Sequence, residues 1–352
     1  MELPSCSIHD QTVRCFRLTN RQAMSVELME YGATIVKVAI PDKSGELVQI
    51  NLGLPDPQSY ATNPAHFGGT CGRYANRISQ GRFELDGRPY QLNLNDGAHH
   101  LHGGITGFDS RHWRATPMSG EEYVGVRMEY TSPDGEEGYP GTLRCLVEFT
   151  LNQASVLTIH YQARVEGVPT VVNLTNHSYW NLAGSGSILG HLLEIPGRSI
   201  LEVNQDTIPT GLIRSVTDTA FDFASPRQIA SHPNDLPLAV NDVTKRGFDH
   251  CYLVERSVDP EQSDLILAAR LTDPVSRRVM DVMTDQPGVQ FYTGTYLDGT
   301  ESVGHFDQYA GLCLECQQFP DAPNHPTFPD VVLKPGETYR QTSSYGFRWP
   351  QG

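Results

Sequence analysis

A single acidic residue interrupts an otherwise apolar run near the carboxyl end of the chain. Glu315 lies within Gly311–Phe319, a stretch whose composition is typical of a buried strand. A carboxylate is costly to bury unless it is paired or used in chemistry. We therefore interpret Glu315 as a functional acid or base rather than as a surface residue.

A second group of polar residues lies on the stretch Val171–Asn181, which opens with β-branched residues and then alternates. In a strand, Asn173, Thr175, His177 and Tyr179 would share one face. Amide, hydroxyl, imidazole and phenol groups in a row can hydrogen-bond the hydroxyls of a sugar, and an aromatic ring can contact its apolar face. The exposed face of an ordinary edge strand would give the same pattern, so this stretch alone leaves both interpretations open.

Two further stretches offer groups that bind hydroxyls. Asn76 and Arg77 follow the Gly-rich run Gly68–Gly72, where the backbone can approach a ligand closely. Asp249 stands beside aromatic residues at the start of a predicted strand, where its carboxylate can accept two hydrogen bonds from neighbouring hydroxyls. Each stretch could equally be a turn with ordinary surface residues.

A metal site is the main alternative for the histidines. His100 and His102 point the same way in an extended chain, as two zinc ligands would. Completing the site would require His177 or a cysteine. Cys313 and Cys316 lie in a predicted strand that directs their thiols to opposite faces. The pattern therefore favours a sugar-binding histidine and predicts no metal.

The composition restricts the partners of the protein. The 352 residues carry a formal net charge of −15, which disfavours nucleic acid, anionic membranes and, more weakly, highly phosphorylated substrates. The seven cysteines are odd in number and scattered, so reduced thiols in a cytoplasmic protein fit better than a disulfide framework. We see no signal peptide and no apolar segment of about 20 residues, and so expect no membrane span.

The turn signals predict an all-β protein, because Gly and Pro recur at short intervals. Apolar alternation predicts strands at Thr12–Leu18, Ser25–Ile40 (broken at Gly32), Phe83–Leu94 (a hairpin around Asp86-Gly87), Val124–Thr131, Leu143–Leu151, Val156–Val165, Leu192–Ile195, Leu265–Leu271, Val289–Thr293 and Gly311–Phe319. We expect no amphipathic helix longer than about two turns, and Asp218–Asp242 is typical of a long loop with one helical turn. One large β-sandwich is the natural architecture.

Taken together, these stretches resemble the aldose 1-epimerase (galactose mutarotase) family. The matching stretches, in the family's order, are Gly72–Ile78, Leu101–Gly104, Asn173–Leu182, Gln286–Gly294 and Leu314-Glu315. The resemblance implies a large antiparallel β-sandwich of the supersandwich kind, with residues 1–352 forming one domain and the site in a cleft across one sheet. It implies no cofactor.

The resemblance also assigns roles to residues of this chain. Glu315 matches the general base and His177 matches the general acid. The residues that match sugar-binding positions are Asn76, Arg77, His102, Asp249 and Gln290, and we count Tyr179, from the polar face described above, with them.

The implied chemistry is the interconversion of α and β anomers of free hexoses such as D-galactose and D-glucose. One group must take the proton of the C1 hydroxyl while another gives a proton to the ring oxygen O5, and the two exchange roles on ring closure. We expect ionised Glu315 and protonated His177 to do this. A nearby carboxylate would raise the pKa of His177 and keep it protonated near neutral pH.

Two other functions on the same fold stay open. A hexose-6-phosphate 1-epimerase would need extra Arg or Lys side chains near the cleft. A non-catalytic sugar-binding protein would not need both Glu315 and His177. In each case we expect a small-molecule aldose sugar as the partner and a monomer or weak homodimer.

Overall fold

The computed structural model describes residues 1–255 and 265–350, and within these ranges its regular elements are β-strands and short 3₁₀ turns. All strand pairs in the sheets are antiparallel. The turns are η1 (Pro57–Ala61), η2 (Ser79–Gly81), η3 (Phe108–Ser110), η4 (Glu136–Gly138), η5 (Ile188–Gly190), η6 (Pro233–Asp235), η7 (Glu301–Val303) and η8 (Ala322–Asn324). No helix in the described residues is long and apolar enough to cross a membrane.

A nine-stranded sheet forms one layer of the molecule. Its strands, in spatial order, are β11 (Arg114–Ser119), β12 (Tyr123–Ser132), β13 (Thr142–Asn152), β14 (Val156–Glu166), β28 (Tyr339–Arg348), β24 (Val279–Thr284), β23 (Ile266–Thr272), β18 (Leu192–Glu194) and β21 (Arg227–Gln228). The alternation in β14 shows why the sheet is buried on one side only. Leu157, Ile159 and Tyr161 are buried in the core, whereas Thr158 and His160 are partly exposed on the other side.

Two smaller sheets form the second layer. The six-stranded sheet has the order β17 (Tyr179–Trp180), β26 (Leu312–Gln317), β25 (Gly288–Tyr292), β22 (Asp249–Leu253), β19 (Ser199–Val203) and β20 (Pro209–Ser215). The five-stranded sheet has the order β1 (Glu2–Ile8), β2 (Gln11–Thr19), β3 (Ser25–Met29), β4 (Thr34–Pro41) and β5 (Leu47–Gln49). Paired two-residue or four-residue strands complete the fold: β6 (Thr70–Cys71) with β16 (Thr175–Asn176), β7 (Arg77–Ile78) with β10 (His100–Leu101), β8 (Arg82–Leu85) with β9 (Arg88–Gln91), and β15 (Thr170–Val171) with β27 (Val332–Leu333).

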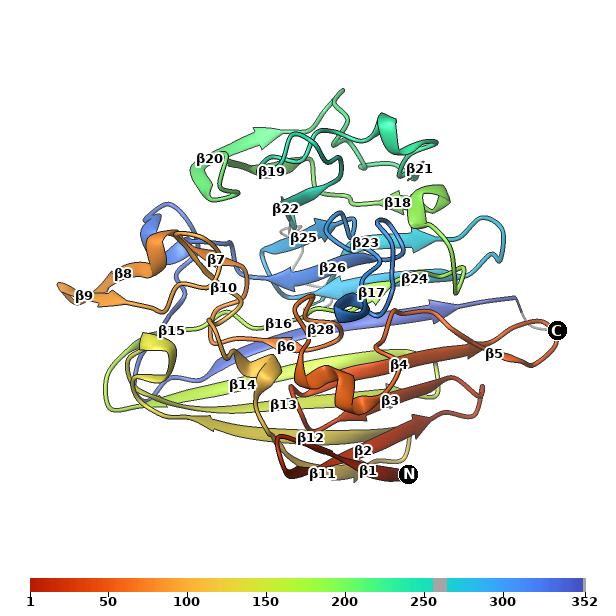
Figure 1. Ribbon diagram of the computed structural model, residues 1–352, viewed down its shortest axis with the longest axis horizontal. Coiled ribbons are helices and arrows are strands. Elements are labelled where there is room, and N and C mark those ends of the chain that lie inside the picture. Colours follow the sequence, from red (N-terminus) through yellow and green to blue (C-terminus); the bar gives the residue numbers. More distant parts are fainter. Residues whose placement is uncertain (256–264, 351–352) are drawn as a thin grey trace.

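The three sheets share one core. In Figure 1 the five-stranded sheet occupies the lower part of the view and the six-stranded sheet the upper part, and the nine-stranded sheet extends along both, from β11 at the bottom to β18 and β21 near the top. One hydrophobic cluster joins Phe16 and Val26 of the five-stranded sheet, Phe291 and Leu314 of the six-stranded sheet, and Phe149 of the nine-stranded sheet. The predicted large antiparallel β-sandwich is confirmed.

Strand β17 connects the two smaller sheets. The amide of Leu52 donates to the carbonyl of Tyr179 at 2.8 Å, and the amide of Asn181 donates to the carbonyl of Ile50 at 2.9 Å. The second layer is therefore continuous across β17, which begins two residues after His177 in the sequence.

The predicted strands are found with shifts of one or two residues at their ends, and the loop 218–242 contains the single 3₁₀ turn η6 and the short β21. Two predictions are wrong in part. The hairpin at Phe83–Leu94 stops at Gln91, and Leu94 is 45% exposed. The stretch Val171–Asn181 is three short strands that pair with different partners instead of one continuous strand. Among strands of five or more residues, the sequence pattern also missed β1, β11, β19, β20, β24 and β28, and it missed several shorter ones, such as β5.

Candidate active site

One face of the six-stranded sheet gathers acidic, amide and aromatic side chains. In the register of β25, β26 and β22, Gln290 lies opposite Glu315, and Tyr292 lies opposite both Cys313 and Asp249. Because side chains alternate along a strand, these residues project from the same face of the sheet. All five are buried or half-buried.

The other face of the same strands belongs to the hydrophobic core. Leu312, Leu314 and Phe291 are almost fully buried in the cluster shared with the nine-stranded sheet. Along β26, the residues of the cavity face, which are polar or cysteine, alternate with the residues of the core face. Because both faces are buried, the sequence around Glu315 looks like one apolar run. The core fixes the sheet and thereby fixes the direction in which Glu315 points.

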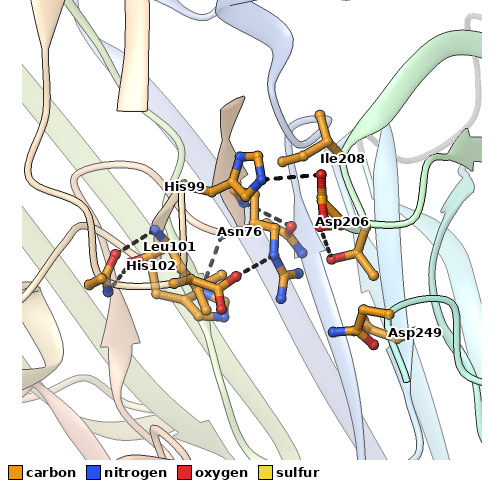
Figure 2. A network of polar contacts seen from close by, with 12 residues as sticks. Asn76, His99, Leu101, His102, Asp206, Ile208 and Asp249 are labelled. Atoms are coloured by element: carbon orange, nitrogen blue, oxygen red, sulfur yellow. Dashed lines mark hydrogen bonds and ion pairs between the residues drawn. The ribbon is translucent and has the colours of Figure 1, made fainter. Parts of the chain in front are cut away.

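The opposite wall comes from the paired strands β7 and β10. Asn76 precedes β7 and His102 follows β10, and each has a positive φ, of 61° and 49°. Their backbones are tied together, because the amide of His102 donates to the carbonyl of Asn76 at 3.1 Å. Figure 2 shows His102 beside Leu101 and Asn76 on one side of this network, with Asp249 on the other.

Arg77 and Asp249 are each held by one neighbour. Nε of Arg77 donates to Asp96 Oδ2 at 2.7 Å. Nε2 of Gln290 donates to Asp249 Oδ1 at 2.5 Å. These contacts leave further guanidinium hydrogens and carboxylate lone pairs free to bind hydroxyl groups.

A cavity of about 550 Å³ lies between the two walls. Its volume is in the range of small-molecule sites. Its lining residues are Pro64, Ala65, His66, Asn76, Arg77, Asp96, Leu101, His102, His177, Tyr179, Asn241, Asp249, Tyr292, Tyr296, Leu297, Asp298, Ser302, Val303 and Glu315. Of the predicted site residues, only Gln290 is outside this lining, and it contacts the cavity through Asp249.

Among the carboxyl and imidazole groups of the cavity, His177 and Glu315 are the most deeply buried. His177 Nε2 lies 3.8 Å from Glu315 Oε1, and their side chains are 6% and 3% exposed. Glu315 Oε2 has no hydrogen-bond partner in the described residues. Two groups that can exchange protons with a ligand therefore lie together, with one carboxylate oxygen left unsatisfied.

Burial drives both members of this pair towards their neutral forms. It lowers the pKa of His177 to about 3, with a further lowering by the charge of His66. Burial also raises the pKa of Glu315 well above its ordinary value, assisted by Asp249 and opposed by Arg77. The expectation that a carboxylate raises the pKa of His177 is therefore wrong for this structure, because the ion pair is too long to outweigh desolvation.

The neighbours of His102 define which of its nitrogens carries a proton. Its Nδ1 accepts a hydrogen bond from the backbone amide of Asn76 at 3.2 Å. Burial lowers the pKa of His102 well below its ordinary value, so the ring is neutral. A neutral imidazole that accepts at Nδ1 carries its hydrogen on Nε2, and His102 can therefore donate to a ligand oxygen.

Two residues flank the ring of His177. Cys313 Sγ lies 3.5 Å from His177 Nδ1. The ring of Tyr179 has its centroid 5.0 Å from that of His177. Both contacts leave Nε2 of His177 on the side of Glu315.

The alternative zinc site built on His100 and His102 does not form. His100 Nδ1 lies 2.6 Å from the carbonyl of Asn93, and its Nε2 lies 2.6 Å from the hydroxyl of Tyr139, so it is part of the packing behind the wall. A different set, His102, His177 and Glu315, has ligand atoms within 4.8 Å of one another and could hold a metal ion. Of the pair His100 and His102, only His102 belongs to this set, together with His177, which the alternative site named as a possible completing ligand.

Two residues of the predicted polar row serve the fold instead of the cavity. The amide of Asn173 bonds the backbone of Ala75 and Gln318, and the hydroxyl of Thr175 donates to the carbonyl of Cys316 at 3.0 Å. They point away from the cavity because the chain turns twice between Val171 and Trp180. His177 and Tyr179 of that row line the cavity.

Sequence reasoning missed several cavity residues, of which His66 is the most informative. His66 Nδ1 lies 2.7 Å from Asp109 Oδ2, although 43 residues separate them. No local spacing could reveal such a contact. The only signal available in the sequence was the position of His66, two residues before the Gly-rich run Gly68–Gly72.

Comparison with known proteins gives one consistent result. Residues 14–346 match the family described as aldose 1-epimerase. The galactose mutarotase of Bos taurus is 41% identical over 341 residues, covering 96% of this chain and 94% of the relative. The aldose 1-epimerase of Escherichia coli (strain K12) is 36% identical over 352 residues, covering 98% of each chain. The crystal structure of galactose 1-epimerase from Lactobacillus acidophilus NCFM superposes with a TM-score of 0.86 at 26% identity, covering 100% of this chain and 99% of that one.

Proposed function

We propose that this chain, which belongs to the aldose 1-epimerase family, interconverts the α and β anomers of free hexoses such as D-galactose and D-glucose. It is an isomerase. The observation that carries the proposal is the pair His177 and Glu315, buried 3.8 Å apart in a cavity of about 550 Å³. The surrounding amide, guanidinium, imidazole and carboxylate groups suit a ligand rich in hydroxyls.

The reaction requires one proton donor and one proton acceptor at the anomeric centre. A carboxylate with an imidazolium satisfies this requirement, and so does a carboxylic acid with a neutral imidazole, because both states hold the same number of protons. In the first state Glu315 takes the proton of the C1 hydroxyl while His177 gives one to O5, and the C1–O5 bond breaks. This produces the open-chain aldehyde and the second, neutral state.

Ring closure reverses these transfers after rotation about the C1–C2 bond. The carboxylic acid of Glu315 returns its proton to the carbonyl oxygen, and neutral His177 takes the proton from the O5 hydroxyl as the C1–O5 bond forms on the other face. Burial favours the neutral state of the pair. Burial therefore lowers the free energy of the protonation state that Glu315 and His177 have while the open-chain aldehyde is bound.

The remaining predicted residues would hold the sugar in place. Nε2 of His102 and the free guanidinium nitrogens of Arg77 donate, and the carboxylate of Asp249 accepts. Gln290 orients Asp249 through its bond of 2.5 Å. Asn76 contributes its side-chain amide. Fixing the sugar in this way supplies the proximity part of catalysis.

The charges of the cavity favour a free sugar over a hexose 6-phosphate. Among the lining residues that the structure describes, Arg77 is the only Lys or Arg, and it is already paired with Asp96. Asp96, Asp249 and Asp298 line the same cavity and would repel a phosphate.

Optical rotation of freshly dissolved, anomerically pure sugars tests the proposal. We expect the wild-type protein to accelerate the mutarotation of α-D-galactose and α-D-glucose in catalytic amounts. Glucose 6-phosphate serves as the competing substrate in the same assay. A protein that binds galactose without accelerating its mutarotation would instead be the non-catalytic sugar-binding protein.

We extend the proposal to the remaining properties of the chain. Residues 1–352 form a single domain, which is supported by the family match over residues 14–346 and by the shared core. All seven cysteines are free, which supports a cytoplasmic location. The protein acts as a monomer or weak homodimer.

A further inference from the structure

His66 is the histidine of the cavity that the proposed reaction leaves without a role. Its side chain is 21% exposed and lines the cavity, whereas the side chain of its partner Asp109 is only 4% exposed. Nδ1 of His66 lies 2.7 Å from Asp109 Oδ2, the distance of a charge-assisted hydrogen bond. Nε2 of His66 has no hydrogen-bond partner in residues 1–255 and 265–350. The ring is therefore anchored at one nitrogen and free at the other.

The backbone around this pair is built for close approach. A Cβ atom at Gly69 would lie 2.7 Å from the Cβ of Asp109, and one at Gly32 would lie 2.3 Å from its carbonyl oxygen. Contacts this short are forbidden to other residues, so glycine at these positions lets Asp109 reach the segment that carries His66. His66 itself has a φ of 56°, in the left-handed region.

The same segment is fastened to His177. The amide of Gly68 donates to the carbonyl of His177 at 2.9 Å, and the amide of His177 donates to the carbonyl of Gly69 at 2.9 Å. The side-chain Nδ2 of Asn176 also donates to the carbonyl of Gly68, at 2.7 Å. His66 and His177 are thus held at a fixed separation, with ring centroids 5.7 Å apart.

We propose that His66, held by Asp109, is a further catalytic residue: its imidazolium donates through Nε2–H to an oxygen of the bound sugar and controls the proton count of the His177–Glu315 pair. The inference rests on the proposed function. It adds a fixed positive charge to a cavity whose other two histidines, His102 and His177, are kept neutral by burial. That charge opposes the uptake of a further proton by the neighbouring ring of His177.

The electrostatic surroundings agree with this role. Burial opposes the charged form of His66, but the contact with Asp109 outweighs it and raises the pKa of His66 above its ordinary value. The charge of His66 contributes to the lowered pKa of His177, and it also lowers the pKa of His102.

Other titratable groups also face this cluster. Glu315 and Cys313 lie against His177, and the rings of His102 and Tyr179 lie beside it. Arg77 and Asp249 act on Glu315 from the two walls. These groups remain in place when His66 or Asp109 is changed, so a shift in those variants reports the His66–Asp109 pair.

The first experiment reads the charge of His66 directly by NMR of ¹⁵N-histidine-labelled full-length protein. In the wild type, we expect His66 to titrate above its ordinary value of 6.5 and His177 to stay neutral down to at least pH 5. In Asp109→Asn, burial acts on His66 without its carboxylate, and we expect His66 to titrate below 6.5. In His66→Asn, which suits a left-handed φ, we expect the titration of His177 to move up by about one pH unit.

The second experiment measures the pH profile of kcat/KM by polarimetry with α-D-galactose. We expect both variants to lose roughly 10–100-fold at pH 7, the loss typical of a hydrogen bond to a charged group. We also expect the acid limb of the profile to move to higher pH, by about one unit, because His177 gains a proton more easily. A purely structural role would lower the rate without moving this limb.

Matched controls lie on the outer face of the nine-stranded sheet. His160→Asn removes an imidazole that contacts Thr342, and Asp281→Asn removes a carboxylate that pairs with Arg270 and Arg348. Both should keep the wild-type profile. A neutral His66 at pH 6.5 in the wild type, or an unchanged acid limb in both test variants, would overturn the inference. A wild-type protein inactive on every aldose would overturn the proposed function instead, and the NMR titration would still decide the charge of His66.

Discussion

Two histidine–carboxylate pairs, each with its histidine in the lining of the cavity, differ in the distance between their two members. His66 and Asp109 approach to 2.7 Å, whereas His177 and Glu315 remain 3.8 Å apart. The short pair makes a hydrogen bond that outweighs burial and favours the charged imidazole. In the long pair burial dominates, and both groups are driven towards neutrality.

The two distances explain how one site can hold a histidine that stays charged next to a pair that exchanges a proton with the ligand. A hydrogen-bonded ion pair stabilises its own charges and gives up a proton only at high pH. A pair that is close without being bonded has two states with the same number of protons, and a ligand can relay a proton from one member to the other. The pair without a hydrogen bond suits acid–base catalysis. The hydrogen-bonded pair suits a constant electrostatic field around the reacting groups.

The largest expected effect comes from removing the carboxylate of the long pair. Glu315→Gln should lower kcat by ~10²–10⁴-fold, the typical contribution of a positioned acid–base group, and keep galactose binding. Polarimetry and calorimetric binding measure the two properties separately. Glu148→Gln, on the outer face of the nine-stranded sheet, is the control and should retain full activity. A near-wild-type rate in Glu315→Gln would remove Glu315 as the base.

Replacing the imidazole of the same pair should have a similar effect for the same reason. We expect His177→Asn to lower kcat by ~10²–10⁴-fold. Because the two groups act on one substrate as a unit, the double variant with Glu315→Gln should be little slower than either single variant. Losses that multiply in the double variant would show that the two groups act independently.

Removing the carboxylate from each pair should change the free energy of unfolding in opposite directions. Because burial raises the pKa of Glu315 above 4.5, ionising it costs stability as the pH rises beyond that value, so Glu315→Gln should gain relative to the wild type between pH 4 and pH 8. The raised pKa of His66 stabilises the fold below pH 6.5. Asp109→Asn should therefore lose about 1–3 kcal/mol at pH 5.5. Urea unfolding at several pH values tests both signs, and equal shifts in the two variants would contradict the comparison.

The smallest expected effect concerns the thiol behind His177. Cys313→Ala removes the contact of 3.5 Å with Nδ1, and because a thiol bonds weakly we expect kcat to fall only about 2–5-fold. Steady-state kinetics with galactose would show this loss in kcat and leave KM nearly unchanged. Cys145→Ala, in the core away from the cavity, is the matched control for the loss of a buried thiol. A loss as large as that of His177→Asn would mean that the thiol takes part in proton transfer.

The sequence predicted the elements whose periodicity is local. Strand β14 alternates over its whole length, and its inward residues are buried as expected. The stretch Val171–Asn181 was read as one strand because alternation continues through it, although its three parts pair with three different partners. Pairing depends on residues far away in the chain, and no local pattern carries that information.

In the candidate site, too, the sequence predicted the features that depend on neighbouring residues and missed those that depend on distant ones. Glu315 was found because a carboxylate in an apolar run is unusual within a few residues. The pKa of His177 was misjudged, because the resemblance that pairs it with the carboxylate of Glu315 does not say whether the two lie at 2.7 or 3.8 Å. His66 was missed because its partner Asp109 is brought to it by the packing of Gly32 and Gly69, which is a property of the folded chain.

The position of β17 has a consequence for how the protein loses activity on heating. Tyr179 and Asn181 bind the backbone of Leu52 and Ile50, so the seam between the two smaller sheets runs beside the reacting groups. If the two smaller sheets separated at this seam, the catalytic residues would move apart before any distant strand unfolded. Heat inactivation should accordingly coincide with the opening of this seam, and reinforcing the seam is the most direct route to a more durable biocatalyst.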